Sequence, residues 1–193
     1  SQARDENGSL ATVYHGTNNA GFTVFNRNVN FYTDSKDVAD TYTNKDGLYE
    51  GYLNIKNPLV IDVDGEKWSR IDVAQVDPAV ADMFNEYGIS TFMEDGAERT
   101  STADIVGAVE DGIDDGVFDY DGIIFKNIYD EGMFGNVAAG TLKSNVYVTF
   151  SSNQFKNVDN TKPTSDPDIR FSLSEKGTMV DGNNNEVTLQ ASD

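Results

Sequence analysis

Apolar and polar residues alternate with a period of two in several short stretches, a pattern that predicts β-strands. These stretches are rich in β-branched and aromatic residues, and several are bounded by Gly, Asn or Asp. The clearest is the run NVYVTF at residues 145–150. We therefore expect strands at residues 11–15, 29–33, 48–55, 59–61, 122–125 and 145–150.

Apolar residues recur at helical spacing in the middle of the chain and after the second expected strand. Asp34-Ser35 is a candidate cap for a helix that runs to about Thr43. Residues 71–87 are expected to be helical and divided near Pro78, and a further helix is expected over residues 101–113. Short strands at both ends with helices grouped between them predict an α+β fold.

Composition changes along the chain and suggests three parts. Residues 1–10 are polar without a period and are expected to form a flexible lead-in. Residues 11–156 are expected to form the domain. Residues 157–193 form a polar C-terminal tail without a core of its own, for which Phe171 and Leu173 are candidate anchors.

The charge is strongly negative and excludes some classes of partner. The 193 residues contain 33 Asp and Glu against 14 Lys and Arg, a formal net charge of −19. Such a chain is repelled by nucleic-acid backbones and by anionic membrane surfaces, so we expect neither a basic nucleic-acid interface nor a membrane partner. Backbone N–H groups can still bind the phosphates of a small cofactor.

The chain has no cysteine and a single histidine, His15. This composition excludes disulfides, thiol nucleophiles, cysteine-ligated zinc and a site with several histidines from one chain. We therefore expect no metal cofactor.

Three motifs follow one another along the chain: Tyr14-His15-Gly16-Thr17, the aromatic-rich segment 31–42, and the strand at 145–150. In this order they resemble the ADP-ribosyltransferase superfamily, in its diphtheria-toxin and poly(ADP-ribose) polymerase branch, over about residues 12–156. The resemblance implies an ADP-ribosyltransferase-like fold of split antiparallel sheets with helices packed around them. It also implies an NAD-binding cleft between the sheets.

Four further segments are similar to transferase domains of polyvalent and head-associated proteins from bacteriophages and prophages. In those proteins a segment like the last of the four often follows the domain. The segments are residues 121–124, 145–148, 153–156 and 166–172.

The resemblance assigns the first motif to NAD. It implies that His15 bonds a ribose hydroxyl and that the backbone of Gly16 pairs with the nicotinamide amide, with Thr17 beside them. A glycine leaves room for that approach because it has no Cβ. Arg27 lies between the first two motifs and could reach the pyrophosphate, or it is a surface residue.

The resemblance also implies an aromatic clamp on nicotinamide. Tyr42 is expected to stack on the ring, and Phe31, eleven residues earlier, is expected to line the pocket. Tyr32 is the alternative to Phe31, because neighbours on a strand face opposite sides and only one of them can face the pocket.

The family's catalytic glutamate is replaced here by Val146. Three explanations remain open. The acceptor itself could supply the carboxylate, Asp130 or Glu131 could supply it from the loop before the strand, or the fold could be degenerate and inactive.

Taken together, these features predict an NAD-dependent mono-ADP-ribosyltransferase that acts on a host macromolecule, a protein rather than a nucleic acid. The alternatives are an inactive fold that serves as a binding or virion-associated module, and an NAD glycohydrolase. We expect a monomer that is virion-associated or acts in the bacterial host cytoplasm.

Overall fold

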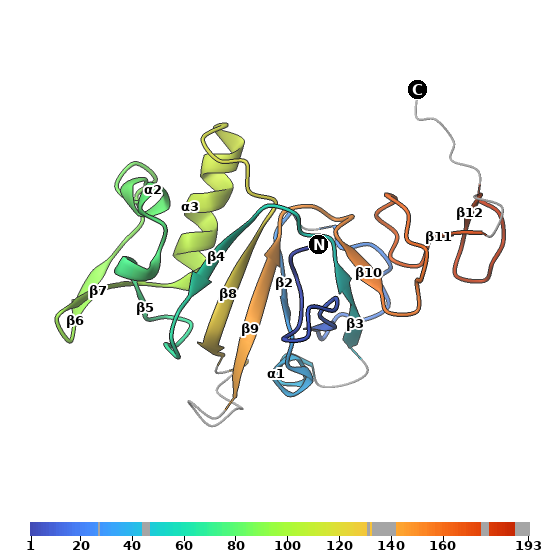
Figure 1. Ribbon diagram of the computed structural model, residues 1–193, viewed down its shortest axis with the longest axis horizontal. Helices are drawn as coiled ribbons and strands as arrows, with labels where there is room; N and C mark the ends of the chain where they lie inside the picture. The colour runs from blue at the N-terminus through green and yellow to red at the C-terminus, as the bar shows by residue number, and fades with distance from the viewer. Residues whose placement is uncertain (27, 44–46, 131, 133–141, 175–177, 188–193) are drawn as a thin grey trace.

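A seven-stranded β-sheet lies at the centre of the computed structural model, which describes residues 1–26, 28–43, 47–130, 132, 142–174 and 178–187 (Figure 1). Its strand order is β10-β3-β1-β2-β9-β8-β4. All neighbouring strands are antiparallel except β4 and β8, which are parallel. The strands are β1 (Val13–Gly16), β2 (Asn30–Thr33), β3 (Leu48–Leu53), β4 (Pro58–Asp62), β8 (Gly122–Tyr129), β9 (Lys143–Thr149) and β10 (Phe155–Asn157).

Short helices and two small sheets complete the described part of the chain, and the predicted α+β class is confirmed. A three-stranded sheet has the order β5-β7-β6, and β11 pairs with β12. These elements are α1 (Lys36–Asp40), β5 (Ile71–Asp72), the 3-10 helix η1 (Val73–Gln75), α2 (Pro78–Asp82), β6 (Phe92–Glu94), β7 (Ala97–Thr100), α3 (Thr102–Asp114), β11 (Ser172–Leu173) and β12 (Met179–Val180).

Side-chain caps start two of the predicted helices. The Ser35 hydroxyl accepts a hydrogen bond from the N–H of Val38 at the start of α1. The Ser101 hydroxyl accepts one from Asp104 at the start of α3. Each cap satisfies a backbone N–H that has no partner within its helix, so both helix starts could be located from the sequence.

The helix expected over residues 71–87 is wrong for most of its length. Ile71 pairs with Thr100 in β5 and β7, and α2 begins only at Pro78. Asp77 caps α2 through the N–H of Ala79. Proline lacks an N–H and suits the first turn of a helix, so Pro78 starts a new helix rather than dividing one.

Two hydrophobic clusters cover opposite faces of the central sheet. One contains Phe125 and Val146 and packs against α2 and α3, and the other contains Tyr147 and Phe155 and is rich in aromatic rings. Neighbouring residues on β8 and β9 belong to different clusters because successive strand side chains point to opposite faces.

The two expected sheets form one continuous sheet, and only a short stretch of pairing connects its two halves. β1 pairs with β2 at one position, Tyr14 with Thr33, whereas β1 pairs with β3 along its whole length and β2 does so with β9. The two halves of the sheet therefore meet at a single residue pair. The seam between β1 and β2 is where a cleft can open.

One residue of the polar lead-in and one of the tail enter a cluster on the central sheet. Ala3, in the expected flexible lead-in, is 1% exposed and belongs to the aromatic-rich cluster. In the tail, Ile169 is buried in the same cluster, whereas the candidate anchor Leu173 is 43% exposed. The anchor expected at Leu173 is wrong, and Ile169 is a tail residue that does enter this cluster.

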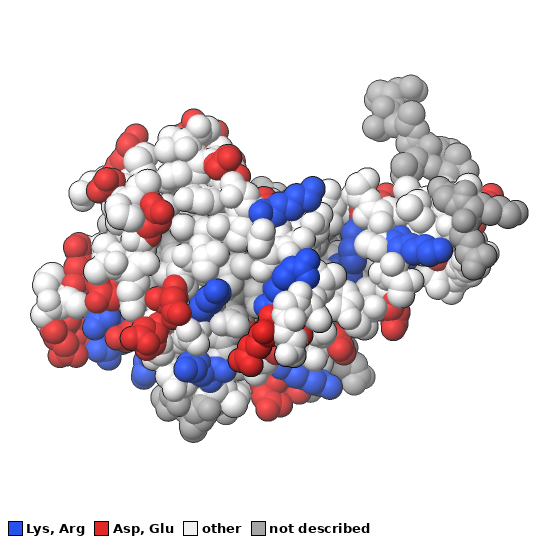
Figure 2. Space-filling view, in the orientation of Figure 1, with Lys and Arg blue, Asp and Glu red and all other residues white. Residues whose placement is uncertain are grey.

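Negative charge is concentrated at one end of the molecule. Residues 62–121, which we call the acidic region, contain 17 Asp and Glu against three Lys and Arg. This region includes α2, α3 and the sheet β5-β7-β6. Figure 2 shows red side chains gathered over this end, while blue side chains lie mainly over the rest of the molecule.

Candidate active site

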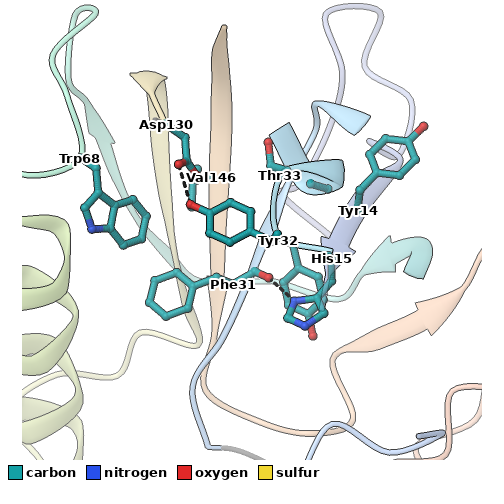
Figure 3. A pocket seen from close by; sticks show the side chains of 11 residues that line it. Tyr14, His15, Phe31, Tyr32, Thr33, Trp68, Asp130 and Val146 are labelled. Carbon is teal, nitrogen blue, oxygen red and sulfur yellow. Dashed lines mark hydrogen bonds between the residues drawn. The ribbon is translucent and has the colours of Figure 1, made fainter. Parts of the chain in front are cut away.

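An apolar cavity of about 260 Å³ opens at the seam between β1 and β2 (Figure 3). Residues from both strands, from α1 and the turn after it, from β9 and from the position after β8 contribute to its walls. The lining residues are Tyr14, His15, Gly16, Phe31, Tyr32, Thr33, Ala39, Tyr42, Trp68, Asp130 and Val146. We call this the first cavity.

His15 is fixed at the seam by a hydrogen bond and by aromatic rings. Its Nδ1 lies 2.7 Å from the carbonyl oxygen of Phe31. Because a carbonyl oxygen only accepts, Nδ1 carries a proton, and in the neutral ring Nε2 is then an acceptor. The rings of Phe25 and Tyr32 lie 5.1 and 5.6 Å from the imidazole. His15 is therefore held in one orientation, with the tautomer that can accept from a hydroxyl group.

Gly16 is required by the packing of α1 against β1. A Cβ at this position would lie 1.8 Å from the carbonyl oxygen of Ala39 and 3.1 Å from the Cβ of Tyr42. The end of α1 can approach the strand only because this side chain is absent. Thr17 follows on the rim, where its N–H donates to Gly47.

Phe31 and Tyr32 point to opposite faces of β2. Tyr32 is 3% exposed and stacks on Phe155, with the ring centres 5.0 Å apart and the planes at 10°. The ring of Phe31 lies 5.5 Å from that of Trp68 on the other face (Figure 3). Both residues line the cavity, but Tyr32 is a core residue and Phe31 is only partly buried.

Tyr42 and Asp130 form a hydrogen-bonded pair inside the first cavity. Tyr42 lies in the turn after α1, which ends three residues before the expected boundary. Its hydroxyl donates to Oδ1 of Asp130 at 2.6 Å, the bond drawn at Asp130 in Figure 3. Burial raises the pKa of the Tyr42 phenol, and the hydrogen bond and charge of Asp130 raise it further. The phenol therefore stays protonated and donates to the carboxylate.

Asp130 is itself largely buried and firmly held. It is 8% exposed, and Oδ1 also accepts the N–H of Gly132 at 2.9 Å. Gly132 has a φ of 67°, and a Cβ there would lie 2.3 Å from the hydroxyl of Thr41. Among the described residues, no hydrogen bond to Oδ2 is found. Oδ1 of Asp130 therefore fixes the orientation of the carboxylate.

A β-bulge places Asp130 on the cavity face. The pairing of β8 with β9 shifts between Phe125 and Ile128, so both of these residues face the cluster that contains Val146. In a regular strand Asn127 and Tyr129 would face that side. The extra residue reverses the alternation and brings Asp130 to the side of Val146.

Asn127 and Asn145 stabilise the bulge. Asn127 has a φ of 57°, a conformation that asparagine tolerates better than most residues. Its N–H donates to Oδ1 of Asn145 at 3.1 Å, and its side-chain amide donates to the carboxylate of Asp62 at 2.9 Å. The amide of Asn145 donates in turn to Asp34 at 2.7 Å. These bonds link β2, β9 and β8 immediately beside Val146.

Val146 lies in the wall of the first cavity. It is 2% exposed and pairs with Thr33 on β2 and Phe125 on β8. The structure therefore brings together His15, Tyr42 and Val146, and it adds the carboxylate of Asp130 beside them. Glu131 and Arg27 lie outside the described residues.

Trp68 is a wall residue that the motif analysis did not identify. Its N–H donates to the carbonyl of Tyr129 at 3.3 Å, and its own carbonyl accepts from Thr102. These bonds fix the turn that carries the indole into the first cavity. Trp68 is the single tryptophan of the chain, and no periodicity in its surroundings marked it as a site residue.

A second cavity of about 690 Å³ continues from the first. The two cavities share His15, Gly16, Phe31 and Tyr42, and the remaining walls come from the segment that joins β1 to β2. No described residue that lines the second cavity is Asp or Glu, although the chain has 33 of them. The residues found there alone are Thr17, Asn18, Asn19, Phe22, Val24, Phe25, Asn26, Val29 and Asn30.

The described residues contain no group of three or more His, Cys, Asp or Glu side chains placed to hold a metal ion. The same residues include no helix with the length and apolar character needed to cross a membrane.

Comparison with known proteins places the chain in a family. A family model described as ADP-ribosyltransferase in polyvalent proteins matches residues 5–165. No curated protein and no solved structure matches the chain. The matched range contains both cavities and every residue of the first. The chain belongs to the ADP-ribosyltransferase family of polyvalent proteins.

Proposed function

We propose that the protein is an NAD-dependent mono-ADP-ribosyltransferase in which Asp130 performs the role of the missing glutamate. The observation that carries this proposal is the position of Asp130, which lies in one cavity with His15 and Val146. The family supports transfer of ADP-ribose in general. The choice of donor, the carboxylate and the acceptor are the proposal.

The two cavities suit the two halves of NAD. The first cavity has flat aromatic walls in Phe31, Tyr42 and Trp68, which suit a nicotinamide ring. The second offers asparagine amides and a threonine hydroxyl, and its described walls have no carboxylate to repel a pyrophosphate. His15 lies between them with Nε2 able to accept from a ribose hydroxyl.

Charge balance explains the need for Asp130. In the transfer, the bond from ribose C1′ to the nicotinamide nitrogen breaks and its electron pair stays on nicotinamide. The acceptor forms the new bond to C1′ with its own lone pair and loses a proton. Positive charge develops on the ribose during bond breaking, and a fixed carboxylate stabilises it. In the proposed mechanism the carboxylate of Asp130 also accepts the proton of the acceptor.

Labelled NAD tests the proposal. The protein is incubated with NAD labelled in the adenosine half and a bacterial lysate, and free nicotinamide and labelled protein or RNA are measured. We expect nicotinamide release together with labelled protein, both strongly reduced in Asp130→Asn and in His15→Ala.

Other outcomes favour the alternatives. Nicotinamide release without labelled macromolecule indicates a glycohydrolase. Transfer that survives Asp130→Asn, together with faster NAD hydrolysis in folded Val146→Glu, indicates a carboxylate supplied by the acceptor or by Glu131. NAD binding without release indicates an inactive binding module. In the proposed role the protein acts as a monomer on a host protein, in the virion or the bacterial cytoplasm.

A further inference from the structure

The segment Asp166–Ser172 lies beyond the residues that the family model matches, yet it contacts the wall of the second cavity. Its motif, DPDIRFS, stands out in the sequence and has no part in the first cavity. We call this segment the brace.

The wall that it contacts has little regular structure of its own. Residues 17–29 join β1 to β2 and supply most of the second cavity. Within the described part of this connection, one β-bridge is present, between Val24 and Asp168. Next to it the N–H of Ile169 donates to the carbonyl of Thr23 at 2.9 Å, and the Thr23 side chain helps to lower the pKa of Asp168. The brace therefore supplies the β-pairing that the wall lacks.

The brace also reaches His15 through one aromatic ring. Ile169 is 3% exposed and is buried in the cluster that contains Phe25 and Phe155. Phe25 lines the second cavity and meets the imidazole of His15 edge-on at 5.1 Å. Closely packed side chains transmit small displacements, so the position of Ile169 bears on both Phe25 and His15.

Several bonds hold the brace in a fixed conformation. The guanidinium of Arg170 donates to both carboxylate oxygens of Asp168, at 2.8 and 3.0 Å. The side-chain amide of Asn160 donates to the carbonyls of Ile169 and Phe171, at 3.1 and 2.7 Å. The buried ammonium of Lys156 bonds the carbonyl of Asp166. A segment held by these bonds can in turn hold the wall.

We propose that the brace positions the wall of the second cavity and thereby sets the affinity for the ADP-ribose half of the dinucleotide. The inference rests on the proposed use of NAD. Thr23, Asp168 and Ile169 are positioning residues, since none of them lines either cavity.

The test compares two ligands on folded, full-length protein. Calorimetry measures the dissociation constants of NAD, which spans both cavities, and of nicotinamide, which occupies only the first. We expect Ile169→Ala to weaken the binding of NAD about fivefold and that of nicotinamide by less than about twofold, because only the wall of the second cavity loses its support. Thr23→Val removes only the hydroxyl that interacts with Asp168, and it is expected to weaken NAD binding by about twofold.

A matched control and an exchange measurement keep the result specific. Asp77→Asn is the matched control. The Asp77 carboxylate also accepts a backbone N–H, but it lies in the acidic region, so this change should leave the affinities for NAD and nicotinamide unchanged. Amide hydrogen exchange over residues 21–26 should accelerate in Ile169→Ala and Thr23→Val.

The outcomes separate this inference from the proposed function. Equal losses for NAD and nicotinamide, or unchanged NAD affinity in Thr23→Val with unchanged exchange, overturn the brace. Should Ile169→Ala fail to fold, Thr23→Val decides. A wild-type protein that binds nicotinamide but shows no added affinity for NAD overturns the use of NAD itself.

Discussion

The two cavities on either side of His15 are built in different ways. The first is walled by strands and by the turn after α1, and the one carboxylate on its described walls, Asp130, is buried and hydrogen-bonded. The second is walled by a connection with little regular structure, contains asparagines and has no carboxylate on its described walls. The first arrangement suits catalysis of bond breaking, which needs a charge in a fixed position. The second suits the binding of an anion, which needs donors and no negative neighbours.

The largest expected effect concerns the carboxylate of the first cavity. Asp130→Asn keeps an oxygen for the Tyr42 hydroxyl but removes the charge, so turnover should fall about 100-fold or more with little change in NAD affinity. Release of nicotinamide measures turnover, and calorimetry measures affinity. The exposed pair of Tyr87 with Asp115 supplies the control, and Asp115→Asn should leave turnover unchanged. Equal effects of the two variants would contradict the assignment.

The next effect concerns packing at the same wall. Gly16→Ala introduces a Cβ that collides with the carbonyl of Ala39, and the free energy of unfolding should fall by about 2 kcal/mol. Gly107→Ala in α3 is the matched control, because a Cβ there has no atom within 4 Å. Alanine also has the higher helix propensity, so this control should stabilise the protein. Urea denaturation measures both changes in the free energy of unfolding. Similar stabilities of Gly16→Ala and Gly107→Ala would show that α1 moves away from β1 without loss of stability.

Tyr42 separates ring packing from hydrogen bonding in the first cavity. Tyr42→Ala should weaken nicotinamide binding about fivefold, a loss of about 1 kcal/mol, if the ring stacks on the ligand. Tyr42→Phe keeps the ring but releases Oδ1 of Asp130, so it should spare affinity and lower turnover. Calorimetry and nicotinamide release distinguish the two. Loss of nicotinamide affinity in Tyr42→Phe would assign the phenol, rather than the ring, to binding.

The smallest effect is a dependence of stability on pH. Burial and Asp130 raise the pKa of Tyr42 above the ordinary tyrosine value, so the folded state retains this proton more strongly than the unfolded state. The resulting stabilisation is complete below the ordinary pKa of about 10 and is lost as the pH rises above it. The stability of wild type relative to Tyr42→Phe should therefore fall between about pH 10 and pH 11. A difference that stays constant over this range would mean that the phenol is not perturbed.

Local signals allowed much of the scaffold to be predicted. Ser35 and Ser101 predict the starts of helices correctly because a side-chain cap is a short-range interaction. Strands β2 and β9 could be recognised from their apolar alternation. The helical spacing at residues 71–87 was misleading, because the pairing of Ile71 with Thr100 is a long-range contact that overrides local periodicity.

The candidate site was less predictable than the scaffold. His15, Tyr42 and Val146 could be aligned to motifs, and the structure places all three in one cavity. The face on which Asp130 lies depends on one extra residue in β8, and nothing in the residue pattern gives the register of β8 against β9. Trp68 was missed because its position depends on contacts with a strand and a helix distant in sequence.

The uneven charge of the molecule has a consequence for the rate at which a ligand arrives. With 17 of the 33 acidic residues in residues 62–121, the protein has a large electric dipole moment whose negative pole is the acidic region. An anionic dinucleotide diffusing toward the protein is deflected from that pole, so productive encounters come from the remaining directions. Added salt shortens the range of this repulsion to about 8 Å at physiological ionic strength. Association should therefore become faster as salt rises, the reverse of the behaviour of enzymes that attract their anionic substrates with a positive surface.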